Sequence, residues 1–576
     1  MGLRRAIGLF FLITAVLVTS CGPSAPSSST GARSTAPGAT LAPKRLTIGM
    51  LGVLPAFWDN LAARGGVVPG AGDFKGLATS GLIVLDDNNV LRPQLGEAVP
   101  SVENGLWQVF PDGRMEVTWR IRDGTRWHDG KPIMSDDLMF AVEVGRDPEI
   151  AVFRSPAYEL IDEVTATDPR TVVVRWNAPY IAADSMFGAG SSGSRMFASV
   201  MPKHVLETPY RENKASFTEL AYWTTEFVSS GPYKLREWVT DSHVALDAFP
   251  DYVLGPPKIS QIEVRFIPDP STLLANVLAG TVDLTFSRSV SIEQAASARE
   301  QWRDGKMVPN INGWTMMYPQ FRVPNPVVML DPQFRRGLVH SIDRQQLADI
   351  LAAGFAPVAD SIISPGLPEY PHVQSSIVRY NHDPARASQL IEAAAGLVRG
   401  VDGYRDAAGQ RISIEMRTTT NDANQKAILA IADNFQRVGL GAETVVIPVQ
   451  RLQDGEYRAT FPGLELVNQP NGADGFQNLL HSANAPLPER GFRAPSSSRN
   501  RGSYMNPEYD ALMDRYNVTV PIPDRMSIMA QLIRQQTDLN LVMGLFFSVD
   551  AIMMANRLQN VPPASSWNAQ EWDATS

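Results

Sequence analysis

Cys21 is the only cysteine among the 576 residues of this chain. A lone thiol cannot form an intramolecular disulfide, so the fold must hold together without one. About 530 residues follow position 44, far more than one hydrophobic core usually serves. The sequence therefore predicts two or three compact units.

The first 21 residues resemble the signal peptide of a bacterial lipoprotein. Arg4 and Arg5 precede an apolar stretch over residues 6–18, which is shorter than the ~20 residues of a membrane-spanning helix. Residues 18–21 read VTSC and resemble a lipobox, where such proteins are cleaved and acylated. An exported protein seldom keeps a free thiol without a use. We therefore expect a lipid anchor on Cys21 rather than a plain secretory signal, and several acyl chains would make it effectively permanent.

Residues 22–44 are mostly Ser, Pro, Gly, Ala and Thr, with no acidic residue, which predicts a flexible tether. After Cys21 the chain has 49 Lys and Arg, because two of the 51 are Arg4 and Arg5, against 60 Asp and Glu. The resulting charge of −11 and the lack of a basic block argue against nucleic-acid binding. No later stretch approaches ~18 uninterrupted apolar residues, so we expect a soluble body.

The spacing of apolar residues predicts an α/β fold. Period-two alternation or short apolar runs predict strands at 44–51, 107–109, 116–122, 170–176, 239–248, 259–267, 412–418 and 443–447. Helical spacing predicts helices after residue 135 and at 272–278, 332–352, 383–395 and 421–438. Residues 86–89 (DDNN) predict a hairpin turn. The order strand, helix, strand over 412–447 predicts a βαβ unit with a right-handed crossover.

Residues 119–144 read WRIRDGTRWHDGKPIMSDDLMFAVEV. Turns at 122–124 and 128–130 are followed by Pro132 and an acidic helix start at 136–137. The whole string closely resembles the signature of family 5 extracellular solute-binding proteins, the oligopeptide-, dipeptide- and nickel-binding proteins of ABC transporters. Further segments match the family in its order: 229–235 with 250–252, 278–283, 334–344, 380–387 and 504–512. The resemblance spans residues 46–561.

The resemblance implies a two-lobe periplasmic-binding-protein-like fold of class II, with an extra subdomain inserted in the first lobe. Two crossing strands would join the lobes, and a ligand would be enclosed between them by hinge closure. The expected division is a signal peptide at 1–21, a tether at 22–44, lobe I at 45–85, 205–305 and 541–576, the inserted subdomain at 86–204 and lobe II at 306–540.

No motif in the sequence predicts catalysis, a cofactor or a metal. Residues 188–193 match G-x-G-x-x-G, but they follow no clear strand, and no acidic residue stands where a ribose would need it. The seven histidines are scattered, without the close spacing of zinc ligands. His128 lies in the family's turn motif and is expected to be structural. There is no G-x-S-x-G, S-x-x-K or EF-hand loop.

Aromatic residues are the better candidates for ligand contact, because polar ligands are often held between aromatic faces and a few aimed hydrogen bonds. Trp58 follows the first strand, where loops of the family reach the cleft. Trp314 and Tyr318 lie in GWTMMYPQF, which corresponds to the strand that enters lobe II. Each of the three residues could instead belong to the core.

Peptide-binding members of the family hold the peptide's amino group with an aspartate in a W-x-x-D motif. The corresponding stretch here is 466–471 (LVNQPN), with Leu466 at the tryptophan position and Gln469 at the aspartate position. We take Gln469 and Asn471 as ligand-binding candidates, and Asp474 could serve only if the loop is shifted. An amide cannot pair with an ammonium as a carboxylate does. Sugars, capped peptides and opines therefore stay open beside free peptides.

The combined interpretation is a lipid-anchored substrate-binding protein of an ABC importer, outside the cytoplasm on the periplasmic or cell-surface side. Its expected partners are the permease subunits, the membrane through the anchor and a small-molecule or oligopeptide solute, and we expect it to act as a monomer. One alternative is a receptor of the same fold that serves sensing without transport. A more remote alternative is an exported enzyme, against which the missing nucleophile and metal motifs argue.

Overall fold

The computed structural model describes residues 43–57, 68–150, 155–189, 196–492, 499–563 and 566–575. Pro43–Ser576 form one compact unit. Cys21, the tether and Trp58 lie outside the described residues. None of the helices in the described ranges is both long and apolar enough to cross a bilayer.

One large sheet runs through this unit in the order β17-β16-β18-β13-β19-β11-β1-β10-β9-β8, with β12 paired to β19. Strand β1 is parallel to β10 and β11, and β16 is parallel to β17 and β18. The strands of this sheet are β1 Arg45–Met50, β8 Tyr233–Val239, β9 His243–Ala248, β10 Gln261–Phe266, β11 Leu284–Thr285, β12 Val290–Ser291, β13 Gly305–Pro319, β16 Ser413–Thr418, β17 Gly441–Val446, β18 Leu464–Gln469 and β19 Met543–Ala555.

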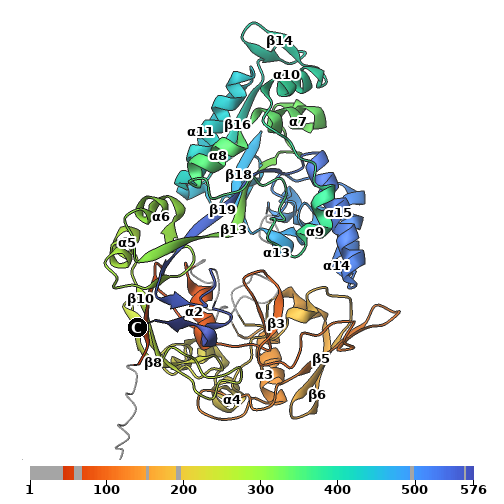
Figure 1. Cartoon of the computed structure of the whole chain (residues 1–576). Helices are drawn as coiled ribbons and strands as arrows, with labels where there is room; N and C mark the ends of the chain where they lie inside the picture. Colours follow the sequence, from red (N-terminus) through yellow and green to blue (C-terminus); the bar gives the residue numbers. More distant parts are fainter. Residues whose placement is uncertain are drawn as a thin grey trace, which may run out of the picture. The chain divides into compact units, whose positions relative to one another are not determined.

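Strands β13 and β19 are the longest in this sheet and join its two ends, as Figure 1 shows. They pair antiparallel from Gly305 opposite Ala555 to Met317 opposite Met543, with register shifts near residues 312 and 315. Helices α7, α8, α10 and α11 lie around β16 at one end, whereas α2 and α4 lie at the other (Figure 1). This arrangement confirms the predicted two-lobe α/β fold.

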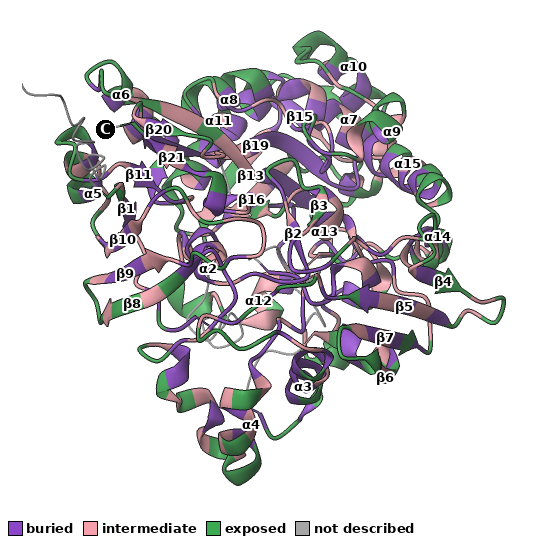
Figure 2. Ribbon diagram, turned by 60° about the horizontal axis from the view of Figure 1, so that its bottom comes forward, coloured by how far each residue is buried: buried purple, intermediate pink, exposed green. Residues whose placement is uncertain are grey.

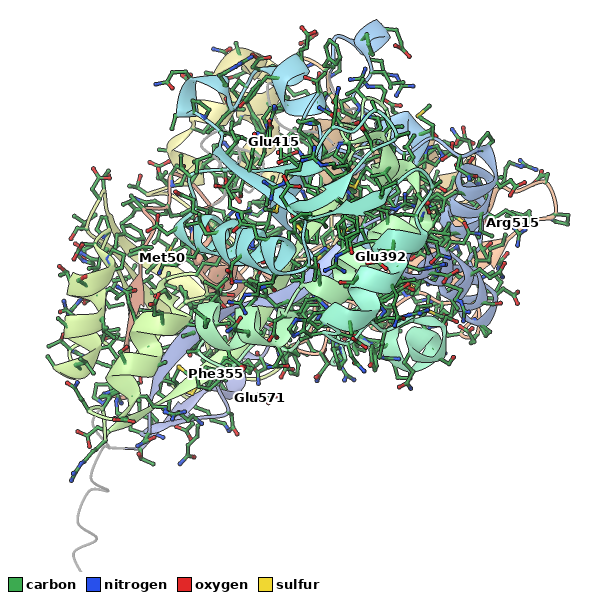
Figure 3. The ribbon with its side chains drawn as sticks, turned by 90° about the horizontal axis from the view of Figure 1, so that it is seen from above. Met50, Phe355, Glu392, Glu415, Arg515 and Glu571 are labelled. Carbon is green, nitrogen blue, oxygen red and sulfur yellow. The ribbon has the colours of Figure 1, made fainter. Side chains whose placement is uncertain are left out.

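The helices are α2 Ala71–Ala78, α3 Ser135–Arg146, α4 Lys203–Glu212, α5 Pro270–Leu278, α6 Ile292–Arg299, α7 Pro332–Ser341, α8 Arg344–Leu351, α9 Tyr370–Val373, α10 Pro384–Ala393, α11 Asp422–Arg437, α12 Gly455–Ala459, α13 Gly472–Phe476, α14 Pro507–Val518 and α15 Ile522–Asp538. Glu392 on α10 and Arg515 on α14 are exposed, and Figure 3 shows Arg515 at the edge of the molecule.

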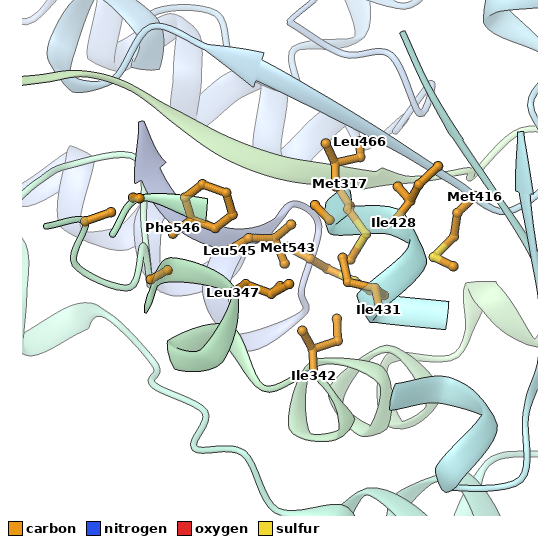
Figure 4. Close-up of a cluster of buried hydrophobic side chains, with 14 of the residues drawn as sticks. Met317, Ile342, Leu347, Met416, Ile428, Ile431, Leu466, Met543, Leu545 and Phe546 are labelled. Carbon is orange, nitrogen blue, oxygen red and sulfur yellow. The ribbon is translucent and has the colours of Figure 1, made fainter. Parts of the chain in front are cut away.

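Two apolar cores cover opposite faces of β13 in its second half. The α11 cluster includes Met317 of β13, Leu466 of β18 and Ile428 and Ile431 of α11, whose side chains converge in Figure 4. The α15 cluster contains Trp314, Met316 and Tyr318 of β13 together with residues of α14 and α15. Successive side chains of a strand alternate between its faces, so Met317 and its two neighbours contribute to different cores.

Two further cores lie away from β16: one packs on the other end of the large sheet, and one on a separate four-stranded sheet. The β1 cluster packs β1, β9 and β10 against α2 and α4. The β7 cluster packs α3 against a separate four-stranded sheet in the order β4-β5-β7-β6. Its strands are β4 Trp107–Val109, β5 Met115–Arg120, β6 Ile161–Asp168 and β7 Thr171–Trp176. Three two-stranded ribbons complete the described strands: β2 Ile83–Leu85 with β3 Leu91–Pro93, β14 Val398–Gly400 with β15 Gly403–Arg405, and β20 Leu558–Gln559 with β21 Asp573–Ala574.

Most predicted elements occur where the sequence placed them. The turn over residues 86–89 joins the antiparallel pair β2–β3, and β16, α11 and β17 form a parallel strand–helix–strand unit. One prediction was wrong: residues 332–352 are two helices, α7 and α8. The chain is extended at Ile342, and the Asp343 side chain caps α8 by accepting a hydrogen bond of 2.9 Å from the amide of Gln346. A second error is that residues 239–248 hold the end of β8, a turn and β9 rather than one strand.

Candidate functional site

A cavity of about 240 Å³ lies between helix α2, the β2–β3 hairpin and strand β13. The segment after residue 565 closes it through Ser566 and Trp567. This segment crosses α2 at Gly76, where a Cβ would lie 2.3 Å from the Ser566 hydroxyl oxygen. Glycine therefore permits the close approach that brings Trp567 to the cavity wall.

Three aspartates line the cavity: Asp73, Asp86 and Asp87. Asp86 is buried and already engaged, because it pairs with Arg92 at 2.9 Å and accepts the turn amides of Asn88 and Val90. Asp87 is exposed on the same turn. Asp73 is only 8% exposed and lies in the first turn of α2, where the helix dipole favours an acidic residue.

Ser287 holds the Asp73 carboxylate in place from outside its own helix. The backbone amide of Ser287 donates to Asp73 Oδ2 at 2.9 Å, and its hydroxyl donates to the same oxygen at 2.5 Å. The next amide along the chain, that of Arg288, donates to Oδ2 of Asp550 on β19. Two carboxylates from distant parts of the chain are thus held by consecutive backbone amides.

Burial perturbs both acids in the same direction. Loss of solvent raises the pKa of Asp73 to about 6, against the opposing effect of the Ser287 hydrogen bonds. The negative charge of Asp550 adds to the rise. Burial also raises the pKa of Asp550, which is 6% exposed, although the Arg288 amide and the nearby side chains of Asn312 and Asn310 oppose it. Each carboxylate therefore binds a proton more readily than it would in water.

Strand β13 contributes Asn310 and Ile311 to the cavity wall. Asn310 lies directly opposite Asp550 in the β13–β19 ladder. Further along these two strands, Thr315 of β13 and Ser548 of β19 are bridged by Asn468 of the neighbouring strand β18. The Asn468 side-chain amide donates to Thr315 Oγ1 at 2.8 Å and to Ser548 Oγ at 3.2 Å. Polar side chains thus recur along the pair of strands that joins the two lobes.

The sequence-predicted contacts on β13 lie inside the protein. Trp314 is 2% exposed and Tyr318 is 0% exposed, and both belong to the α15 cluster. The Trp314 indole N–H and the Tyr318 hydroxyl have no hydrogen-bond partner among the described residues. Figure 2 shows this part of the sheet as a buried centre beneath more exposed helices.

Gln469 and Asn471 lie at the end of β18, close to these aromatics. Gln469 is half-buried and pairs directly with Trp314 in the ladder, so their side chains share one face of the sheet. The Asn471 side-chain amide donates to Ser364 Oγ at 3.3 Å. The structure therefore brings Trp314 and Gln469 together, whereas none of the four predicted residues lines the 240 Å³ cavity.

A second cavity of about 40 Å³ lies between the segment after β7 and the helices α13, α14 and α15. Ile181 and Ala182 face Tyr516, Met526 and Asp474 across it. Ile181 belongs to the α15 cluster, although it follows β7 in the chain. Conversely, Val520, which lies between α14 and α15, belongs to the β7 cluster. The segment after β7 and the α14–α15 region therefore touch through apolar side chains away from the crossing strands.

His128 has the structural role that the turn motif predicted. Its Nδ1 accepts the amide of Ser229 at 3.3 Å, so Nε2 carries the proton and donates to the carbonyl of Gly231 at 3.0 Å. Burial lowers the pKa of His128 to about 4, which keeps the ring neutral. Within the described ranges no three His, Cys, Asp or Glu side chains form a group that could hold a metal ion.

Sequence reasoning missed Asp73 and Asp550, and only one of them carried a signal. Asp550 interrupts the apolar run LFFSVDAIMM, where a carboxylate is expensive to bury and therefore informative. Asp73 lies in a short helix with no motif around it. No pattern could reveal that residues 73 and 550 meet, because Ser287 and Arg288 bring them together from a third segment.

A family model for bacterial extracellular solute-binding proteins, family 5, matches residues 97–486. A putative ABC transporter peptide-binding protein of Brucella ovis is 26% identical over 348 residues, which cover 57% of this chain and 60% of that protein. The match thus spans three fifths of the Brucella relative's length. The oligopeptide-binding protein AppA of Bacillus subtilis is 22% identical over 474 residues, covering 81% of this chain and 79% of AppA.

Two solved structures share the fold. NikZ from Campylobacter jejuni, in complex with Ni(L-His), has a TM-score of 0.67 and 18% identity, covering 92% of this chain and 100% of NikZ. AppA from Bacillus subtilis, in complex with a nonapeptide, has a TM-score of 0.63 and 18% identity, covering 93% of this chain and 100% of AppA.

Proposed function

The chain belongs to the bacterial extracellular solute-binding proteins of family 5, and we propose that it captures a small polar solute for an ABC importer. The observation that carries this proposal is the cavity between α2 and β13, whose wall offers carboxylates, amides and an indole. Small-molecule sites combine a concave wall with a few placed polar groups. Capture and release need no catalytic side chain, so we propose that the protein is not an enzyme.

The proposed ligand is peptide-like or another polar solute. The Brucella relative is described as peptide-binding, and AppA was solved with a nonapeptide. Gln469 and Asn471 are half-buried and stay proposed contacts, together with Trp58. Trp314 and Tyr318 stay proposed contacts only for a state in which the α15 cluster opens, because both are buried in the described conformation.

We propose that the ligand is enclosed by hinge closure, with lobe I at 45–85, 205–305 and 541–576, the inserted subdomain at 86–204 and lobe II at 306–540. Strands β13 and β19 would carry the hinge. The reciprocal packing of Ile181 in the α15 cluster and of Val520 in the β7 cluster supports this proposal. A ligand gains affinity when such contacts stabilise the closed state.

Closure can be tested with Ile181→Ala. Removing this contact should weaken ligand affinity roughly tenfold, because about 1.4 kcal/mol less energy would hold the lobes together. The melting temperature of the ligand-free protein should fall as well, because Ile181 is buried in the α15 cluster, so affinity is compared at a temperature at which both proteins are folded. Val520→Ala should behave in the same way, since it removes the reciprocal contact. Unchanged affinity in both variants, measured by titration calorimetry, would mean that these contacts play no part in closure.

Lipid anchoring through Cys21 is the proposed means of attachment, with the protein outside the cytoplasm and the tether giving the body reach. The permease subunits of the importer are the proposed partners. A body held beside the membrane can pass its solute to a permease at high effective concentration. The protein is proposed to act as a monomer.

Cys21→Ser tests the anchor. The variant should partition into the aqueous phase of a detergent separation and lose uptake in cells, while its purified body keeps the ligand affinity of the parent. A membrane-bound Cys21→Ser protein would contradict acylation at this position.

The principal test is a thermal-shift screen of the purified body against peptides, amines, oligosaccharides and metal chelates. A solute present at 100 times its dissociation constant should add ~2.7 kcal/mol of stability. Deletion of the gene should then abolish cellular uptake of the solute found. If no solute raises the melting temperature, the proposed capture is wrong. If a solute binds but uptake persists, sensing becomes the better explanation.

A further inference from the structure

Asp73, at the wall of the cavity, and Asp550 are two buried carboxylates held by one short segment. Each Oδ2 accepts one of two consecutive amides, from Ser287 and Arg288, and the charge of Asp550 acts on Asp73. Asp73 lines the cavity itself, and Asn310, directly opposite Asp550 in the ladder, lines it too. Asp73 therefore faces the space in which a solute would bind, and Asp550 adds its negative charge from behind the lining residue Asn310.

Nothing among the described residues neutralises this pair. Within the described ranges neither carboxylate forms an ion pair, although the Arg288 side chain is close enough to favour their charged forms. Two buried like charges repel each other, and an unpaired buried charge is expensive. By contrast Asp86, on the same cavity wall, has its own arginine.

Asp550 is buried, and one of its carboxylate oxygens lacks a hydrogen bond of normal geometry. Its side chain is 6% exposed, and Oδ1 has no such bond within the described ranges, although the side-chain amides of Asn310 and Asn312 are close enough to favour its charged form. Asp550 shares one face of β19 with Ile552, which packs in the β1 cluster beside α2, and the charge of Asp550 acts on Asp73 of that helix. Asp550 thus lies on the Asp73 side of the strand, behind the residues that line the cavity.

The other cavity residues also suit a cation. Besides the three aspartates, the described lining has amides, the hydroxyls of Thr79 and Ser566, glycines, apolar side chains and Trp567, but no Lys, Arg or His. The Trp567 indole N–H has no partner among the described residues and could donate to an acceptor on the same ligand. Indole faces also attract cations. The absence of a three-ligand group in the described ranges argues for an organic cation over a metal ion.

We propose that the solute carries an ammonium or guanidinium group, which binds at the carboxylate of Asp73, where the buried charge of Asp550 adds to the attraction. This inference rests on the proposed capture function and names the chemistry of its ligand. It places the cation on the lobe I side of the site, whereas the resemblance would have placed it at Gln469. A charged hydrogen bond is about twice as strong as a neutral one, so a buried pair of carboxylates can select for such a group.

Matched probes and matched variants test the inference. The probes are 1,5-diaminopentane, Lys-Ala-Ala and Arg-Ala-Ala, each beside a neutral counterpart, acetylated on its amines or carrying citrulline for arginine. Their affinities are measured by titration calorimetry for the parent, Asp73→Asn, Asp550→Asn and the control Asp304→Asn. Asp304 is exposed just before β13 and outside the cavity lining, so its variant changes the net charge alone.

At least one cationic probe should bind the parent ten times more tightly than its neutral counterpart. Asp73→Asn and Asp550→Asn should each lose that tenfold preference, and Asp304→Asn should keep it. The comparison of probes on the parent does not depend on whether a variant folds. Equal affinity for the cationic and neutral forms, or an undiminished preference in both variants, overturns the inference while leaving solute capture intact. If neither these probes nor any solute of the thermal-shift screen binds, the proposed function fails and this inference fails with it.

Discussion

The two halves of strand β13 differ sharply in burial. Residues 305–312 are exposed or half-buried, whereas residues 313–319 are all buried. The aromatic residues Trp314 and Tyr318 belong to the buried half, and Asn310 and Ile311, which line the cavity, belong to the open half. One strand thus builds a core with its second half and borders a candidate ligand site with its first.

The difference shows why aromatic residues were the weaker guide to the site. A tryptophan on a strand between two lobes has the same sequence signature whether it touches a ligand or fills a core. Helices α14 and α15 cover the second half of β13, so its aromatic side chains are buried in the α15 cluster. In the first half only Ile311 packs against that cluster, and it stays half-buried at the cavity, while the partner strand carries the buried Asp550 opposite Asn310.

Trp314→Ala is the variant with the largest expected effect on this comparison. It should lower the free energy of unfolding by roughly 3–5 kcal/mol, because a large buried ring leaves a cavity in the α15 cluster. Asn310→Ala, in the open half, should cost less than about 1 kcal/mol and instead weaken ligand binding. Urea denaturation and calorimetry measure the two quantities. A stable Trp314→Ala protein that had lost its ligand would reverse the assignment of the two halves.

Asp73→Asn should stabilise the ligand-free protein by about 1–3 kcal/mol at pH 7. The folded state holds this buried carboxyl at a pKa of about 6, above its ordinary 3.8, so ionisation costs stability that an amide avoids. The amide oxygen can still accept the Ser287 hydrogen bonds. Thermal melts of the two proteins without ligand give the comparison. A destabilised variant would show that the carboxylate serves the fold rather than the site.

The raised pKa of Asp73 gives the free energy of unfolding a pH dependence opposite in sign to the one that His128 gives. Because the folded pKa of Asp73 is raised, its contribution to stability grows as pH falls from about 6 to about 4. The lowered pKa of His128 removes stability as pH falls from 6.5 to about 4. The difference in unfolding free energy between Asp73→Asn and the parent isolates the aspartate. That difference should shrink as pH falls from 7 to 4, and a constant difference would contradict the assignment to Asp73.

Tyr318→Phe is expected to have the smallest effect. The Tyr318 hydroxyl is buried without a described partner, so its removal should change stability by less than about 1 kcal/mol in either direction. Tyr509 is an equally buried control whose hydroxyl donates to the carbonyl of Leu479 and accepts from Gln536. Tyr509→Phe should cost about 1–3 kcal/mol, because it leaves buried groups unpaired. Equal losses in the two variants would mean that Tyr318 has a partner of comparable strength.

The sequence predicted the family and many of the elements because both depend on local patterns. The string around His128 predicted turns that the structure contains, and the alternation of β5 and β7 reflects one face against the β7 cluster. The break between α7 and α8 was missed, because the apolar spacing continues across the capping residue Asp343. The lobe boundaries and the ligand contacts stay predictions.

By itself the sequence determined the α/β character, the two-lobe family and the absence of a disulfide, since motifs, periodicity and a single cysteine are visible without contacts. Only the tertiary structure decided which half of β13 is open and which residues meet at the cavity. Burial depends on the helices that pack over a strand, and these come from α14 and α15, far along the chain. The pairing of Asp73 with Asp550 depends on two consecutive amides from a third segment, a contact that no local pattern encodes.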